Sequence, residues 1–290
     1  VQLAEDAAIL PGGAIGEVER GGTFDFTLNA GDVVEVASDG TGDLGGTLIT
    51  ADHPVQVLSG ASCASIARAS TEGATCDHLE ESVQPAETLG KHYVVSLPSG
   101  ALGYPNAHRV RIFGNVDGTQ LTWGTPVPAS TPTTIDAGQV IDLGIVDSDL
   151  EVTGDHEIAV ATFLASKAEV SPEDLQSRGD PSQSQAVATE QFRKSYVFLA
   201  PLDYDVNLID VTMPLNATVE LDAAPLPVAP TPIGTSGFGV ARVRLGAGKA
   251  GAHTVRSDVP VGVQVLGYGA FTSYQYPAGL DLKYISPPPN

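Results

Sequence analysis

The sequence contains two cysteines, Cys63 and Cys76, and the second is followed directly by Asp77 and His78. Thiolate, imidazole and carboxylate groups bind zinc, so this cluster could hold a metal or a reactive thiolate. A structural zinc site needs four ligands in short paired spacings, and no second pair lies nearby. Two cysteines in a secreted chain instead pair readily. The sequence therefore favours a disulfide that closes a loop and adds about 3 kcal/mol of stability.

Carboxylates on short loops are a second group that could do chemistry, because calcium takes hard oxygen ligands. The residues concerned are Asp203 and Asp205, Asp147 and Asp149 with Glu151 beside them, and Asp39 and Asp43. None of these groups follows the EF-hand spacing, and solvated turns are the favoured explanation of the same residues. Calcium is the one cofactor that the sequence leaves open.

Patterns typical of enzymes are missing. The sequence has no G-x-S-x-G nucleophile elbow and no H-E-x-x-H metal-binding pair. Thirty-five acidic residues leave room for the paired carboxylates of a glycosidase, but no spacing singles out a pair. We expect a protein without catalytic residues, and an enzyme acting on polysaccharide is the least favoured alternative.

The charge of the chain excludes several partners. Its formal net charge of −21 repels the phosphate backbone of nucleic acids and anionic lipid headgroups. No stretch approaches the roughly 18 consecutive apolar residues of a membrane span. We therefore expect neither nucleic-acid binding nor membrane insertion.

An internal repeat organises the chain, with an offset of 103 residues. The matching stretches are ITADHPVQV at 49–57, VTGDHEIAV at 152–160 and VRSDVPVGV at 255–263. Asp52, Asp155 and Asp258 share one position in this frame, and each is predicted to accept backbone hydrogen bonds in a structural turn. In the same frame ETLGKHYVVSLP at 87–98 lies over EQFRKSYVFLAP at 190–201.

Each copy of the repeat is predicted to be a β-sandwich. Short alternating segments rich in Val, Thr and Ile, separated by many of the 32 glycines and 21 prolines, are typical of strands joined by tight turns. The fold prediction is all-β, with tandem antiparallel β-sandwich modules. Their predicted ranges are 1–87 for a partial first module that ends in the disulfide loop, 88–190 for the second, and 191–290 for the third with its Pro-rich tail at 286–290.

The first copy begins late in the repeat frame. Its opening strand would start about ten residues before Val1, so we expect either a longer chain or a strand from a neighbouring chain at that edge.

The frame also interprets the cysteine loop. Cys63 falls on Ser166 and Asp77 falls on Asp180, so the second copy makes the same loop without sulfur. Asp77 and Asp180 are then a shared structural turn. Loops on a rigid scaffold usually carry binding, so the loops 59–87 and 165–190 are the predicted display surfaces.

Four stretches of the sequence carry a family resemblance. They are ITADHPVQVLSGASC, CDHLEESVQPAETLGKHYVVSLP, GDPSQSQAVATEQFRKSYVFLAP and PIGTSGFGVARVRLGAGKAGAHTVRSDVPVGVQVLGYGAFTSYQYPAG. In this order they resemble the N-terminal region of the IgG Fc binding protein family, a domain that also occurs in bacterial surface proteins. The resemblance implies an extracellular or cell-surface, all-β module with adhesive or structural duties and no catalytic residues.

The function expected from these observations is non-enzymatic display of loops on rigid tandem sandwiches. The partners would be a protein or glycan ligand on a surface, or copies of the same chain. The alternative is a subunit of an extracellular filament or surface fibre assembled by strand sharing, which the late start of the first copy motivates.

Overall fold

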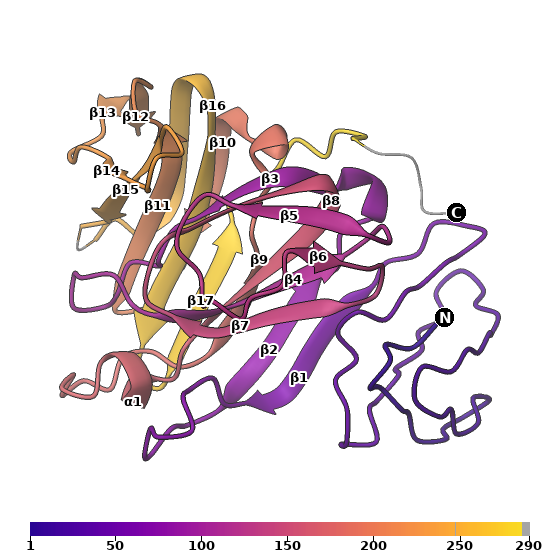
Figure 1. Cartoon of the computed structure of the whole chain (residues 1–290). Coiled ribbons are helices and arrows are strands. Elements are labelled where there is room, and N and C mark those ends of the chain that lie inside the picture. The colour runs from indigo at the N-terminus through magenta and orange to yellow at the C-terminus, as the bar shows by residue number, and fades with distance from the viewer. Residues whose placement is uncertain (247, 286–290) are drawn as a thin grey trace.

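The computed structural model describes residues 1–246 and 248–285 (Figure 1). Within these ranges the chain forms 17 strands, one short α-helix and two 3₁₀ turns, so the all-β prediction is confirmed. The helical pieces are α1 (Lys167–Val170), η1 (Ala86–Thr88) and η2 (Thr189–Gln191). None of these described helices is long and apolar enough to cross a bilayer. The predicted Pro-rich tail at 286–290 lies outside the described residues.

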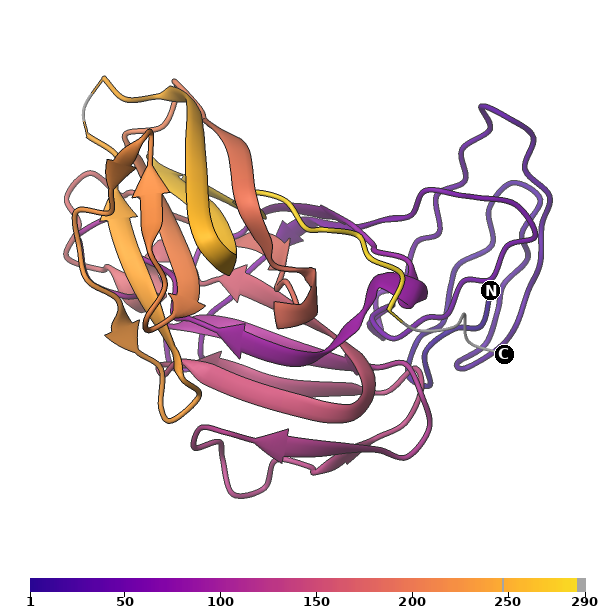
Figure 2. The same cartoon turned by 90° about the horizontal axis from the view of Figure 1, so that it is seen from above.

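The N-terminal part has little regular structure. Strands β1 (Leu58–Ala64) and β2 (Asp77–Ser82) form a two-stranded antiparallel sheet. Residues 1–57 contain isolated β-bridges around a small core of Leu3, Ala4, Ala7 and Ile9. Figure 2 shows this indigo segment to one side of the larger sheets. A sandwich over residues 1–87 therefore stays a prediction from the sequence.

The middle part is a seven-stranded antiparallel sheet that curls around its own core. Its strands are β3 (Gly90–Val95), β4 (His108–Gly114), β5 (Thr119–Trp123), β6 (Thr134–Ile135), β7 (Val140–Val146), β8 (Leu150–Leu164) and β9 (Ser182–Gln185). Strand β4 alternates buried and half-buried residues along its length, as a strand with one face in the core does. The buried residues include Val110, Ile112, Val152 and Ile158.

The C-terminal part is an eight-stranded antiparallel sheet with a separate core. Its strands are β10 (Arg193–Ala200), β11 (Val206–Pro214), β12 (Val219–Leu221), β13 (Ala224–Pro225), β14 (Thr231–Pro232), β15 (Phe238–Arg244), β16 (Gly251–Gly269) and β17 (Thr272–Pro277). The core includes Phe198, Ile209, Val211 and Val265. The strands between residues 88 and 190 and those between residues 191 and 285 thus belong to different sheets. The division into modules remains a prediction.

The long strands β8 and β16 correct the expected turns at Asp155 and Asp258. Both residues lie inside a continuous strand rather than in a turn. The first half of β8 pairs with β3 and β5, and its second half pairs with β4 and β9, so one strand serves two sides of the curled sheet. A register shift in the pairing of β3 with β8 lets the strand bend without ending.

Two tyrosines fix the opening strand of each large sheet in the same way. Tyr93 pairs with Val152, and its hydroxyl donates to the carbonyl oxygen of Ile158 at 2.6 Å. Tyr196 pairs with Val255, and its hydroxyl donates to the carbonyl oxygen of Val261. Each contact in one sheet lies 103 residues from its counterpart in the other. These contacts agree with the predicted offset, while the repeat over the whole chain remains a prediction.

A buried carboxyl group joins the middle and C-terminal sheets. Asp210 on β11 is 2% exposed and accepts hydrogen bonds from the backbone N–H of Ser99, at 2.8 Å, and from its hydroxyl. Burial raises the pKa of Asp210 to about 6, although the Ser99 bonds and the charge of Arg242 work against the rise. Arg242 also donates to the carbonyl oxygen of Leu97 at 3.0 Å. The two sheets are therefore linked by polar contacts that are mostly shielded from water.

Candidate functional site

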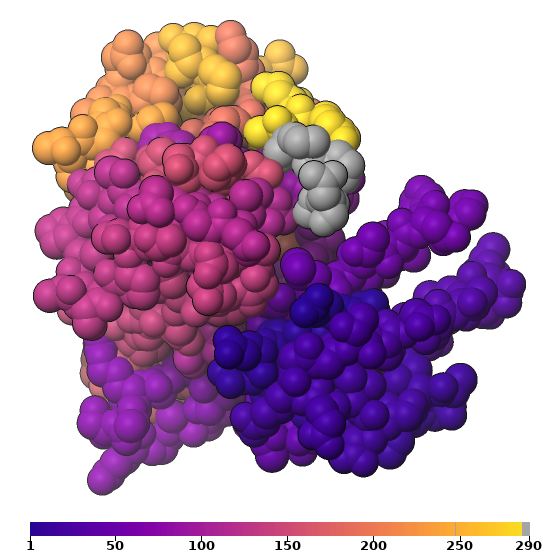
Figure 3. All heavy atoms as spheres, turned by 45° about the vertical axis from the view of Figure 1, so that its right-hand side comes forward, coloured from indigo at the N-terminus to yellow at the C-terminus, as the bar shows by residue number. Residues whose placement is uncertain are grey.

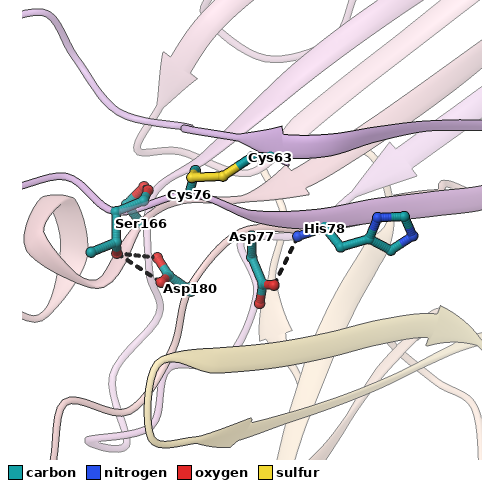
Figure 4. The surroundings of a disulfide bond; sticks show 7 residues. Cys63, Cys76, Asp77, His78, Ser166 and Asp180 are labelled. Atoms are coloured by element: carbon teal, nitrogen blue, oxygen red, sulfur yellow. Dashed lines mark hydrogen bonds between the residues drawn. A yellow bond between two sulfur atoms is a disulfide. The ribbon is translucent and has the colours of Figure 1, made fainter.

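The predicted disulfide is present in the structure. Cys63 and Cys76 are bonded, with their Cα atoms 5.2 Å apart, at the end of the hairpin formed by β1 and β2 (Figure 4). The hairpin pairs Leu58 with Ser82, and the bond closes its loop at the far end. We call residues 65–75 the disulfide loop. Because the bond fixes both ends of this loop, its conformational freedom is much reduced.

The structure does not support a metal centre at the cysteines. Both sulfur atoms are used by the disulfide, and the His78 ring points away from them (Figure 4). His78 Nε2 lies 3.4 Å from a carboxylate oxygen of Glu80. Over residues 1–246 and 248–285, no group of three or more His, Cys, Asp or Glu side chains is arranged to hold an ion.

The disulfide loop docks on the loop that joins β8 to β9. We call residues 165–181 the partner loop. The backbone N–H of Ser166 donates to the carbonyl oxygen of Ile66 at 2.8 Å, and its hydroxyl donates to the carbonyl oxygen of Thr75 at 2.8 Å. The two loops that the sequence predicted as separate display surfaces therefore form one surface, because main-chain groups of one are satisfied by the other.

Asp180 is one polar anchor of this docking. It is 2% exposed, and the Thr75 hydroxyl lies 2.6 Å from its Oδ1 and 2.7 Å from its Oδ2. Burial raises the pKa of Asp180 above its usual range; the Thr75 bond opposes this rise and the nearby charge of Asp77 adds to it. Asp77 lies at the start of β2, where its Oδ1 accepts the backbone N–H of His78 at 2.8 Å. The two aspartates of the predicted turn thus have different partners.

Glu169 in α1 is a second anchor, and no sequence pattern indicates it. Its side chain is 3% exposed. It accepts the backbone N–H of Arg68 at 3.0 Å, together with bonds from the Arg68 guanidinium and the Thr71 hydroxyl. Burial raises the pKa of Glu169, but the bonds from Thr71 and Arg68 outweigh it and hold the pKa below its usual range. This carboxylate therefore stays ionised and pins the tip of the disulfide loop.

Apolar side chains fill the space beneath the docked loops. Ile66 of the disulfide loop packs with Leu79 of β2 and with Phe163 of β8. Ile66 is 6% exposed and Leu79 is 4% exposed, so this is a true small core. Apolar burial and hydrogen bonds therefore hold the two loops together, and the disulfide closes the first of them.

The outer rim of the docked loops is open to solvent. Leu175 of the partner loop is fully exposed, and Tyr104, 42% exposed, donates its hydroxyl to Glu173. Tyrosine is enriched in protein interfaces, and a leucine beside it adds apolar area that a partner could cover. We name the exposed surface of the disulfide loop, the partner loop and Tyr104 the docked-loop surface.

The carboxylates proposed for calcium are mostly engaged with protein donors or spread over the surface. Asp39 accepts the N–H of Thr41, Asp43 accepts the N–H of Gly45, and Asp149 accepts the N–H of Leu97, each at 2.8 Å. Asp203, Asp205 and Asp147 are exposed, and Glu151 lies 3.0 Å from His92 Nε2. Calcium binding by these groups stays a prediction that the structure does not test.

The three repeated aspartates have two different environments. Asp155 accepts the N–H of Gln120, and Asp258 accepts the N–H of Thr218, each at 2.8 Å. Both bonds tie a long strand to the segment beside it. The side chain of Asp52 is 96% exposed and lies 3.2 Å from His53 Nδ1. Asp52, the counterpart of Asp155 and Asp258 in the N-terminal part, thus accepts no backbone hydrogen bond from a neighbouring described segment.

Comparison with known proteins gives one family. A family model described as IgGFc binding protein matches residues 1–267. A human protein named IgGFc-binding protein is 45% identical over 53 residues, which is 18% of this chain and 1% of the human protein. The chain therefore spans a small part of that curated relative. No solved structure matches.

Proposed function

Because the chain belongs to the IgGFc binding protein family, we propose that it is an extracellular, non-enzymatic protein-binding module with an adhesive role at a cell surface. The docked-loop surface would carry the binding. The ligand class is a folded protein, and the relative's printed name makes the Fc fragment of immunoglobulin G the first probe.

The observation that carries this proposal is the set of buried contacts that hold the docked-loop surface in one conformation. Glu169 and Asp180 lie buried beneath it, and the disulfide closes one of its two loops. A preformed surface loses little conformational entropy when it binds, so more of the contact energy becomes affinity. The fully exposed Leu175 supplies an apolar group that a partner could bury.

The test measures binding of immunoglobulin Fc to the whole immobilised chain by surface plasmon resonance, with a panel of extracellular proteins and a glycan array beside it. We expect saturable binding to a protein probe. Leu175→Asp should weaken it by about tenfold, because the change places a charge in the buried centre of the interface.

Leu282→Asp is the matched control, since Leu282 is 56% exposed and lies in the C-terminal segment after β17. It should change the affinity by less than about twofold. Binding to glycans alone, or equal effects of the two substitutions, would contradict a protein-binding role for the docked-loop surface.

Two hollows in the described surface give the polysaccharide-enzyme alternative no support. One, beside Tyr93 and Gln191, has a volume of about 30 Å³, which is room for one water molecule. Another, beside Arg193 and Lys194, is wide open, and Asp281 is the one carboxylate among its described lining residues. A glycosidase needs two carboxyl groups facing one another across a cleft.

A filament subunit is the second candidate function, and one observation favours it. Residues 49–56 are an exposed segment that leads into β1, with a bend at Asp52 and His53, and no strand pairs with it among the described residues. Self-association through this segment would give fibres, and sedimentation of the purified chain at rising concentration tests it. A chain that stays monomeric at all concentrations would rule this role out.

A further inference from the structure

Residues 49–56 form eight consecutive residues whose backbone makes no hydrogen bond to any described residue. All eight are exposed, with Ile49 at 47% and Val55 at 51%. Figure 3 shows that the indigo and violet N-terminal part, to which they belong, projects from the body of the molecule. The chain bends at Asp52 and His53, within the interval where the pairing of β3 with β8 shifts register in the middle sheet. Unpaired backbone with exposed branched side chains on either side of such a bend is a template for another strand.

The two large sheets show what pairs at the equivalent positions. Ile49 lies 103 residues before Val152 and 206 before Val255. Val152 pairs with Tyr93 of β3, and Val255 pairs with Tyr196 of β10. In both sheets the segment that corresponds to residues 49–56 therefore carries an antiparallel strand with a tyrosine.

The hairpin after this segment keeps the same offset. Leu58 pairs with Ser82, as Ala161 pairs with Gln185, and the N–H of Val83 donates to Val57 as that of Ala186 does to Val160. Each residue lies 103 positions from its counterpart. The register of a strand on residues 49–56 can therefore be taken from the other sheets.

The backbone of Ile49 faces the free side. Leu48 exchanges both of its backbone hydrogen bonds with Gln2, at 2.9 Å each. Its counterpart Glu151 likewise uses its carbonyl oxygen for Gly124, on the side of β5. Because neighbouring residues of an extended chain direct their N–H and C=O groups to opposite sides, those of Ile49 point away from Gln2.

Pro54 does not block such pairing. In the C-terminal sheet the equivalent residue is Pro260, which lies in β16 where the register with β10 shifts between Arg256 and Val261. A proline at a bulge needs no ladder hydrogen bond. Pro54 would occupy the same bulge.

We propose that residues 49–56 are an acceptor site for an antiparallel strand of the β3 and β10 type, supplied by a further module of the same family. The strand carries a tyrosine opposite Ile49, and its hydroxyl donates to the carbonyl oxygen of Val55, as the hydroxyls of Tyr93 and Tyr196 do in their sheets. This site is separate from the docked-loop surface, and the proposal does not depend on the filament candidate.

A lysine two residues before the tyrosine adds charge complementarity. Lys91 Nζ donates to the carbonyl oxygen of Asp155 at 2.6 Å, and Lys194 has the same place before Tyr196. In the acceptor the corresponding carbonyl oxygen belongs to Asp52. The whole chain also carries a formal net charge of −21. An incoming basic strand is therefore favoured over an acidic one.

The test uses a fluorescein-labelled peptide of residues 193–201, RKSYVFLAP, and measures its fluorescence anisotropy with the whole chain. We expect saturable binding that Ile49→Pro weakens by about tenfold, because proline removes the N–H that the strand must accept from. Thr50→Pro is the matched control, since its ring lies on the opposite side, and it should change the affinity by less than about twofold. Tyr196→Phe in the peptide should weaken binding by about fivefold.

A second measurement tests the same pairing if the free peptide binds too weakly to be detected in solution. The same nine residues are fused ahead of Val1 through a flexible Gly-Ser linker, which raises their effective concentration to about the millimolar range. The amide of Ile49 should then exchange with solvent at least about tenfold more slowly than in the unfused chain. Equal exchange in both chains, or equal effects of Ile49→Pro and Thr50→Pro, would overturn the proposal. The chain could bind the peptide and still sediment as a monomer at all concentrations. That result would support the acceptor site and contradict the filament role.

Discussion

The hydroxyl of Thr75 donates to the carboxylate of Asp180 across the junction of the disulfide loop and the partner loop, and the two residues are 105 positions apart in the chain. Thr75→Val keeps the shape of the side chain and removes the donor. We expect a loss of about 1 to 3 kcal/mol in the free energy of unfolding, because a buried carboxyl group loses its partner. Urea unfolding followed by circular dichroism measures it.

Thr41→Val is the control for this change, because the Thr41 hydroxyl also donates to an aspartate, Asp39, but on the open surface. It should cost no more than about 0.5 kcal/mol. Equal losses for the two variants would show that the Thr75 contact contributes nothing special to the docking of the loops.

Reduction of the Cys63–Cys76 bond should lower the free energy of unfolding by about 2 to 3 kcal/mol, because the open loop regains conformational freedom in the unfolded chain. The double variant Cys63→Ser, Cys76→Ser should reproduce the value without reductant. Denaturant titrations with and without reductant measure the effect. A reduced chain as stable as the oxidised one would disprove it, provided that mass spectrometry shows the gain of two hydrogen atoms.

Tyr93→Phe and Tyr196→Phe should each destabilise the chain by about 1 to 2 kcal/mol. In each variant a buried carbonyl oxygen, that of Ile158 or Val261, loses the hydroxyl that satisfies it. Tyr284→Phe is the control, since Tyr284 is 70% exposed, and it should have almost no effect. Thermal unfolding of the three variants side by side would decide the matter.

Asp210 gives the stability a definite dependence on pH. Its pKa in the folded chain is raised to about 6 from 3.8, so the folded state binds more protons than the unfolded state between these values. Stability from this group is therefore fully present below pH 3.8 and is lost as the pH rises from there through about 6. Between pH 8 and pH 5 the gain should be about 1 to 2 kcal/mol.

Asp210→Asn isolates this contribution. Burial lowers the pKa of His108 to about 4, so His108 destabilises the fold as the pH falls from 6.5 towards 4 and opposes Asp210. His108 is present in both proteins, so the difference between them reports on Asp210 alone. That difference should favour the variant more at pH 8 than at pH 5, and a difference independent of pH would contradict the buried ionisation.

The sequence predicted the all-β fold because alternation is visible residue by residue, as in β4, where every second side chain enters the core. It misplaced Asp155 and Asp258. An Asp shortly before a Pro, as Asp258 before Pro260, is typical of a turn, and Asp155 shares its position in the repeat, whereas here a bulge lets one strand continue. The docking of Arg68 and Thr71 on Glu169 could not be predicted, because it joins residues about 100 positions apart with no pattern of their own.

The covalent bond at the end of the β1–β2 hairpin has a consequence for the life of the chain outside a cell. Arg68 lies between Cys63 and Cys76, and it is the one basic residue in that interval, so any cut that a trypsin-like protease makes within this loop falls after Arg68. The cut chain would stay one molecule, because the bond holds the two fragments together. Gel electrophoresis would then show the cut chain at its full size until a reductant separates the two fragments.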